Sequence, residues 1–519
     1  MSFTRITKFI LLAVLLLPFE VFADTGFFQD VGLDFHGYFW ARRFSVYQND
    51  ADNNAGMGGI NYMTQELRLY PELKLNENIT LYMDAMLFSN FMGVDDGTIL
   101  TYDVSDKTGN MILKRIYGKI KTSFGIFEIG QMPSHWGLGM LSNDGDHELD
   151  FGDTEFGDTY GRVLFATKPL GEDNSLTVAV YYDNIVEGTE TPFLSGTANV
   201  GDNDNDVGEF GLAATYNPMK YLETGFYFVY RFQQKTDTTI YIPDLYISFN
   251  KDIWHVDFEG AYISGKTNSV PILHADLTID YPTISIEQFG ALLVAGAKVK
   301  PLDDVSIKIG YASGDDSLPN SLNDSKLQAF SFNKNYKVGL IMFDVVDRYL
   351  TQEFTNNYIN SLNSPISQGN GTVADAINFK AKENSQSSQL AQLEGTIAAF
   401  GPSNGSIRNA FFINPVIKYK PIDDMLLKLG VLGAWANKRV RTRELVNKGL
   451  LPDNAFDDSY GLGVNYGWEV DLGASYSFTE NAVIGLQAGY FFPGNVYVKR
   501  NGSKADNVFT IIPRFTINF

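Results

Sequence analysis

The chain has 519 residues, with 61 acidic against 40 basic side chains, a formal net charge of −21 and no cysteine. The absence of cysteine excludes a disulfide scaffold, a thiolate metal site and a cysteine nucleophile. The acidic balance argues against a nucleic-acid partner, because phosphate binding needs clustered Lys and Arg. Hydrolase, zinc-protease and P-loop motifs are also missing, and the five histidines are scattered singly, so we predict no enzymatic activity.

The N-terminus predicts export. Arg5 and Lys8 precede an apolar run from Phe9 to Phe19, which is too short to cross a bilayer as a helix. The run is followed by the tripeptide at 21–23, which fits a signal-peptidase site, so we predict a signal peptide at 1–23 and a mature chain at 24–519. Because no later stretch is apolar enough for a transmembrane helix, the exported chain is expected to be soluble or a β-barrel.

Alternation of apolar and polar residues predicts β-strands along almost the whole chain. The last segment, 508–519, has apolar residues at nearly every odd position, and 66–75, 222–233, 254–262 and 469–478 alternate in the same way. Many of these segments exceed ten residues and have aromatic residues near their ends, the pattern of a lipid-facing band around a polar interior. The predicted fold is all-β, a transmembrane antiparallel up-and-down barrel.

The turns give the number of strands. Eight short turns are expected on the periplasmic side, at 76–78, 122–124, 171–174, 218–220, 251–252, 301–304, 421–424 and 479–481. Their hairpins, together with a first strand at 33–47 and a last at 508–519, give eighteen strands. Residues 316–407 would then form one unusually long extracellular loop or a plug insertion. Its apolar stretch Val338–Val346 also fits two more strands, so twenty is the alternative.

Charged side chains on the inward face of these strands are candidates for a constriction. One hypothesis is a transverse field that orients polar solutes, and the other is that any polar lumen contains ion pairs whatever passes through it. Cations and anions on this face nearly balance. The candidate pore-lining residues are Arg42, Arg68, Arg115, Arg162, Arg231, Arg514, Glu66, Glu128, Asp257, Glu259, Glu469 and Asp471.

The excess acid is concentrated in the long loops, so we expect it at the cell surface. Residues 133–158 alone carry seven acidic and no basic side chains. Asp202, Asp204, Asp206 and Glu209 alternate at a spacing that suits calcium, and a second acidic cluster lies at 144–153. The alternatives are solvated acidic loops or loose divalent bridges to lipopolysaccharide. No other cofactor is expected.

Two segments resemble known barrels. Residues 466–496 resemble the closing hairpin of alginate-export-type barrels, with Glu469, Asp471 and the Phe-Phe-x-Gly at 491–494 in matching places. Residues 130–162 are similar to porin-like barrels of delta-proteobacterial type that have no assigned substrate. The resemblance implies an eighteen-stranded outer-membrane barrel and, for the exporter family, a basic arginine-lined pore for an anionic polysaccharide. The balanced charge predicted here departs from that pore.

The prediction is therefore an outer-membrane channel of a Gram-negative bacterium for passive diffusion of small polar solutes. The alternatives are an alginate-export-type polysaccharide channel and a plugged structural or adhesion barrel. The expected partners are outer-membrane lipid and lipopolysaccharide, periplasmic chaperones, the barrel-assembly machinery, and a small polar solute or a polysaccharide.

Overall fold

A computed structural model describes residues 32–48, 60–91, 112–154, 157–171, 175–186, 206–269, 272–273, 279–315, 326–346, 405–438, 463–497 and 505–519. The predicted signal peptide lies outside these ranges, as do Asp202 and Asp204. Within them, no helix is long and apolar enough to cross a membrane.

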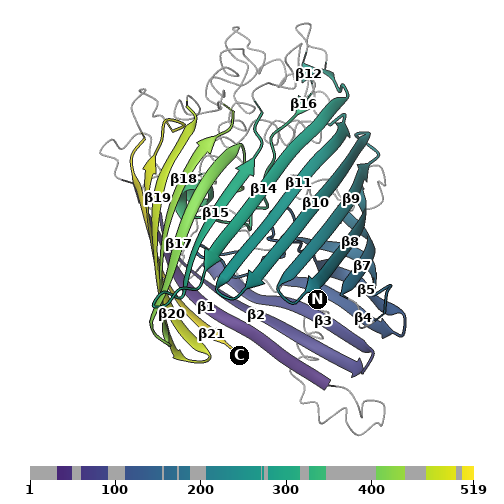
Figure 1. The fold of residues 1–519 in the computed structure, drawn as a ribbon, viewed down its shortest axis with the longest axis horizontal. Coiled ribbons are helices and arrows are strands. Elements are labelled where there is room, and N and C mark those ends of the chain that lie inside the picture. The colour runs from purple at the N-terminus through teal and green to yellow at the C-terminus, as the bar shows by residue number, and fades with distance from the viewer. Residues whose placement is uncertain are drawn as a thin grey trace, which may run out of the picture.

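Eighteen long antiparallel strands form a closed barrel (Figure 1). The first strand pairs with the last over most of its length, and the backbones of Gly37 and Phe519 exchange hydrogen bonds of 2.9 and 3.0 Å at the end of this seam. The prediction of eighteen strands is confirmed and the alternative of twenty is wrong. The strands are β1 (Gly32–Gln48), β2 (Ile60–Asn76), β3 (Ile79–Phe91), β4 (Ile112–Thr122), β5 (Gly125–Pro133), β6 (Thr159–Thr167), β7 (Leu176–Val186), β8 (Val207–Met219), β9 (Leu222–Gln233), β10 (Thr238–Lys251), β11 (Trp254–Thr267), β14 (Ile284–Ala297), β15 (Asp304–Ala312), β17 (Ala410–Ile422), β18 (Met425–Ala436), β19 (Asn465–Thr479), β20 (Ala482–Pro493) and β21 (Val508–Asn518).

Seven of the eight predicted short turns lie between neighbouring strands, at the lower rim in Figure 1 where the chain also ends, and most of the eighth, at 171–174, lies outside the described residues. Side chains close several of them. The Asn76 carboxamide oxygen accepts the N–H groups of Asn78 and Ile79, both at 2.9 Å, and Thr479 caps the turn before β20 in the same way. Three short strands lie outside the barrel wall proper: β12 (Ile272–Leu273) pairs with β13 (Ile279–Asp280), and β16 (Lys326–Leu327) adds in parallel to β14.

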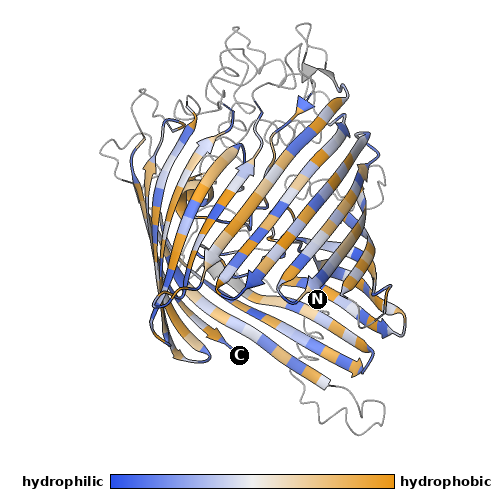
Figure 2. Ribbon diagram, in the orientation of Figure 1, coloured by the Kyte–Doolittle hydropathy of each residue, from blue (hydrophilic) through white to orange (hydrophobic). Residues whose placement is uncertain are grey.

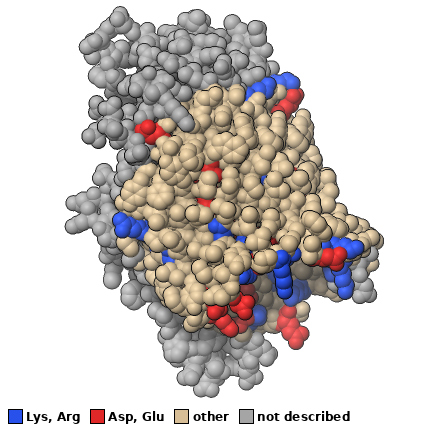
Figure 3. All heavy atoms as spheres, turned by 60° about the vertical axis from the view of Figure 1, so that its left-hand side comes forward, with Lys and Arg blue, Asp and Glu red and all other residues tan. Residues whose placement is uncertain are grey.

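The two faces of the wall differ as the alternation predicts. On β19, Trp468 and Leu472 are 47 % and 55 % exposed on the outside, whereas Glu469 and Asp471 are fully buried on the inside. Figure 2 shows this alternation along the strands, and Figure 3 shows an outer face with a broad uncharged area above charges gathered toward its lower edge. The outer surface is therefore suited to lipid contact.

Two segments fold into the barrel instead of away from it. The first, residues 134–154 with 157–158, is called the inner loop here, and the second, residues 326–346, the inner strap. Phe151 of the inner loop lies so close to the wall that a Cβ on Gly430 would be 2.5 Å from its ring. Phe330 of the inner strap covers Gly290 in the same way, at 2.2 Å. Small residues on the wall thus make room for aromatic rings from the interior.

These segments correct two expectations. The acidic residues at 133–158 were expected at the cell surface, but the inner loop lies within the lumen, where cations of the wall bind it. The stretch Val338–Val346 was considered for two extra strands or a plug, and its last six residues form a short π-helix, η4 (Ile341–Val346), packed against β19, β20 and β21. One side of the lumen therefore holds an apolar core, built on residues such as Phe332, Leu340 and Phe412. The apolar stretch Val338–Val346 was the sequence signal for that core.

The difference between the two faces can be tested on one strand. Leu472 lies at the middle of β19 and points outward, whereas Ser475 lines an internal cavity. Leu472→Arg should lower the free energy of unfolding by about 2–4 kcal/mol, because it places a cation in the apolar band. Ser475→Arg should cost much less. Urea unfolding in phospholipid vesicles measures both, and equal costs would contradict the assigned orientation.

Candidate functional site

The inner loop is attached to the wall by carboxylates that each bind two basic side chains. Asp150 accepts from Lys308 of β15 at 2.5 Å and from Lys418 of β17 at 2.6 Å. All three side chains are at most 28 % exposed. Asp150 is thus the shared partner of two ammonium groups on adjacent strands, and Glu148 and Asp304 add negative charge near Lys418.

Asp153 makes the equivalent contact at the barrel seam. It forms ion pairs with Arg42 of β1 and Arg514 of β21, which lie directly opposite each other in the strand register. Both guanidinium groups also lie over the Trp40 ring, 4.7 and 5.2 Å from its centroid. Two facing arginines would repel each other, and the Asp153 carboxylate between them reduces this repulsion.

Asp146 provides the third attachment. It binds Arg68 of β2 at 3.1 Å and pairs with Arg115 of β4. Arg68 also donates to Asp84 of β3 at 2.7 Å. The inner loop is thus held on three parts of the wall, at β1 and β21, at β2 to β4, and at β15 to β17. We call these three contacts the carboxylate clamps.

Acidic side chains of the wall bind the backbone of the interior segments. Glu469 accepts the N–H groups of Leu340, Ile341 and Met342 at 2.6, 2.7 and 2.7 Å. Across the barrel, Glu259 accepts the N–H groups of residues 138 and 140. The indole N–H of Trp136 donates to Asp244 at 3.1 Å. Glu469, Glu259 and Asp244 are therefore buried wall carboxylates that bind backbone and indole N–H groups.

The remaining candidates pair within the wall. Arg162 donates two bonds of 2.7 Å to Asp183, and Arg231 binds Glu209 at 2.9 Å. The Tyr38 hydroxyl donates to Glu66 at 2.5 Å. In addition, Glu128 binds Lys119 at 3.0 Å, and Asp257 lies on the inward face of β11. The twelve predicted residues share the inward face, but the structure does not gather them at one constriction: the arginines lie in separate pairs and clamps, and Glu259 and Glu469 bind backbone N–H groups.

Sequence reasoning missed the residues that connect these groups. Asp146, Asp150 and Asp153 were considered only as part of an acidic cluster, and the structure places basic side chains on all three. The signal was the interleaving of these acids with Leu149 and Phe151, which suits a buried loop. The calcium hypothesis for 202–209 stays untested, although Glu209 is engaged by Arg231.

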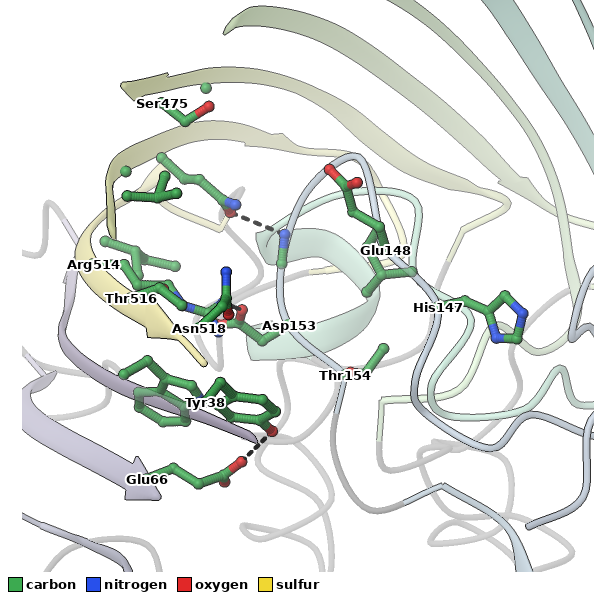
Figure 4. A pocket seen from close by; sticks show the side chains of 18 of the residues that line it. Tyr38, Glu66, His147, Glu148, Asp153, Thr154, Ser475, Arg514, Thr516 and Asn518 are labelled. Carbon is green, nitrogen blue, oxygen red and sulfur yellow. Dashed lines mark hydrogen bonds and ion pairs between the residues drawn. The ribbon is translucent and has the colours of Figure 1, made fainter. Parts of the chain in front are cut away.

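A cavity of about 570 Å³ lies between the inner loop and the wall formed by β1, β2 and β18 to β21 (Figure 4). The close-up shows Tyr38 and Glu66 on one side and Asp153 beside Arg514 on another. Its charged lining is nearly balanced. It consists of the basic residues Arg68, Lys428 and Arg514 and the acidic residues Glu66, Asp146, Glu148 and Asp153.

The clamps keep the loop carboxylates ionised. Burial alone would raise the pKa of Asp150, but Lys308 and Lys418 lower it below its ordinary value of 3.8. Burial opposes ionisation of Asp153 too, yet Arg42 and Arg514 lower its pKa as well. At neutral pH both carboxylates are therefore negative and bind their cations.

Comparison with known proteins gives no family. No family model and no curated protein matches the chain. Solved structures with a similar fold include Pseudomonas aeruginosa OprD, at 10 % identity over 95 % of this chain and 96 % of that one with a TM-score of 0.46. Two others are P. aeruginosa OccK8 (OprE) and Acinetobacter baumannii OccAB4. Each is 9 % identical over 94 % of this chain and 98 % of the other chain, with TM-scores of 0.46 and 0.47. Such low values assign neither a family nor a substrate, and the resemblance to alginate exporters gains no support from them.

Neutralising two clamps should release the inner loop. In Asp150→Asn/Asp153→Asn, each lost charged contact should weaken docking by about 1–3 kcal/mol, so the undocked population rises about tenfold or more. Limited proteolysis with an enzyme that cleaves after acidic residues should then cut the loop faster. Asp237→Asn is the control, because it removes an exposed pair with Lys266 outside the inner loop. Equal cleavage of the double variant and the control would contradict the clamps.

The clamps should also respond to acid. A carboxylate with a lowered pKa in the folded state stabilises that state above its ordinary value of 3.8. This stabilisation is lost as the pH falls through the lowered pKa of the carboxylate in the folded state. Trp40 fluorescence, isolated in a variant whose other tryptophans are Phe, should therefore change below pH 3.8 in the otherwise native chain, because Arg42 and Arg514 of the Asp153 clamp lie over its ring. The Asp150→Asn/Asp153→Asn variant should show little change, and a transition near neutral pH would contradict the assignment.

Proposed function

We propose that the chain is a channel of a Gram-negative outer membrane for passive diffusion of small polar solutes, with the inner loop as its constriction. The observation that carries this proposal is the loop itself, an acidic segment attached by three clamps to opposite parts of a closed barrel. A loop held in this way narrows a lumen without requiring the strands to move. The apolar outer face supports the membrane location.

The charges favour small solutes over an anionic polymer. The cavity has three basic and four acidic side chains, so it offers no continuous positive path. The inner loop and inner strap also occupy part of the lumen that an extended polysaccharide would need. These features disfavour the polysaccharide exporter, and they favour a weakly selective passage in which Arg and carboxylate groups lie on opposing sides.

Lipopolysaccharide, periplasmic chaperones and the barrel-assembly machinery remain proposed partners that follow from the proposed location. A plugged structural barrel is the second candidate function. The observation that favours it is the apolar core that the inner strap forms on one side of the lumen. The two candidates differ in whether ions cross the protein.

Single-channel recording in a planar bilayer decides between them. The refolded chain should give a stable conductance with weak ion selectivity. Lys428 and Glu148 line the cavity and pair at 3.1 Å, so they form a matched test. Under a salt gradient, Lys428→Gln should shift the reversal potential toward the value for a cation-selective pore. Glu148→Gln should shift it toward the value for an anion-selective pore. Absence of conductance would favour the plugged barrel, whereas strong anion selectivity would favour the exporter.

A further inference from the structure

Two histidines and an aspartate of the inner loop converge outside the clamps. Their ligand atoms, one each from His135, Asp144 and His147, all lie within 4.8 Å of one another. The Asp144 Oδ1 atom is 3.1 Å from Nδ1 of His147 and 3.5 Å from Nδ1 of His135. The imidazole rings are stacked, with centroids 3.8 Å apart. Both Nδ1 atoms therefore approach the same carboxylate oxygen.

The hydrogen bond on the far side of His135 fixes its tautomer. The Nε2 atom lies 3.2 Å from the carbonyl oxygen of Gly137, and a carbonyl can only accept, so Nε2 carries the hydrogen. In the neutral ring the lone pair is then on Nδ1. That atom is buried and has no hydrogen-bond partner among the described residues. A lone pair that faces a carboxylate at 3.5 Å needs a positive charge between the two atoms, which either a proton on the ring or a bound metal ion supplies.

This arrangement matches the surroundings of metal ligands. A metal-binding histidine usually donates its other N–H to a carbonyl or carboxylate, which orients the ring. Asp144 is also held in place, because its Oδ1 accepts the N–H of Asp146 at 3.1 Å and its carbonyl accepts from Arg115 at 2.5 Å. These contacts fix the carboxylate in place beside both imidazole rings.

We propose that His135, Asp144 and His147 bind one divalent transition-metal ion, with zinc as the first choice. Two imidazole nitrogens and one carboxylate oxygen suit zinc, with water as the fourth ligand, and they disfavour calcium, which takes oxygen ligands. The His147 ring is 59 % exposed, so it can turn out of the stack until the ion lies in the plane of both rings. His147 also lines the cavity, so the ion would add positive charge there.

Zinc titration of the refolded full-length chain tests the site. Isothermal calorimetry should give one saturable site for each chain. His135→Ala and His147→Ala should each weaken binding by about tenfold or more, since even outer-shell partners act on this scale. His255→Ala is the matched control, because His255 lies 3.6 Å from Asp304 on the wall without a second histidine. Heat-modifiable gel mobility verifies that each variant is folded.

A spectroscopic measurement identifies the ligands directly. Copper(II) bound to the native chain should show electron paramagnetic resonance couplings from two nitrogens, and His147→Ala should remove one of them. No saturable zinc binding, or equal binding in the native chain and both histidine variants, would overturn the proposal. Metal binding and conductance are measured separately. If the chain binds zinc but does not conduct ions, the metal site stands and only the proposed channel function is wrong.

Discussion

The interior of this barrel depends on charge compensation between the wall and the inner loop. The wall presents pairs of cations on neighbouring strands, such as Lys308 with Lys418 and Arg42 with Arg514. Each pair would be unstable in a lumen from which water is partly excluded, because removing one partner of a buried charge costs about 3–5 kcal/mol. Carboxylates of the inner loop provide the missing charge. The position of the loop, and hence the shape of the cavity, follows from this requirement.

Acidic side chains of the wall also accept hydrogen bonds from backbone N–H groups of the interior segments. A segment that enters a barrel without joining its sheet brings backbone N–H groups that no strand can bind. Glu469 satisfies three consecutive N–H groups at the start of η4, and Glu259 satisfies two in the inner loop. The near balance of wall charges therefore does not imply that wall cations and anions pair with one another. Wall cations bind carboxylates of the inner loop in the clamps as well as wall neighbours such as Asp183 and Glu209.

The strand architecture could be predicted because it depends on local patterns. Alternation assigns each strand residue to one face, and turns such as Asn76–Asn78 contain their own hydrogen-bond acceptors. Eighteen strands and the inward orientation of the charges followed from these two signals. The clamps could not be predicted in this way. Asp153 meets Arg42 and Arg514 across 111 and 361 residues, and an acidic loop has the same composition at the surface as in the lumen.

The place of Asp153 at the seam has a consequence for the order of assembly. Its two arginines belong to the first and last strands, so its binding site is complete only after β21 has joined β1. Before closure, the Asp153 carboxylate can bind Arg42 of β1 but not Arg514 of β21, which is synthesised last. Docking of the inner loop is therefore coupled to closure of the cylinder. An unclosed chain keeps a wide and loosely filled interior, and the final strand both seals the wall and narrows the passage.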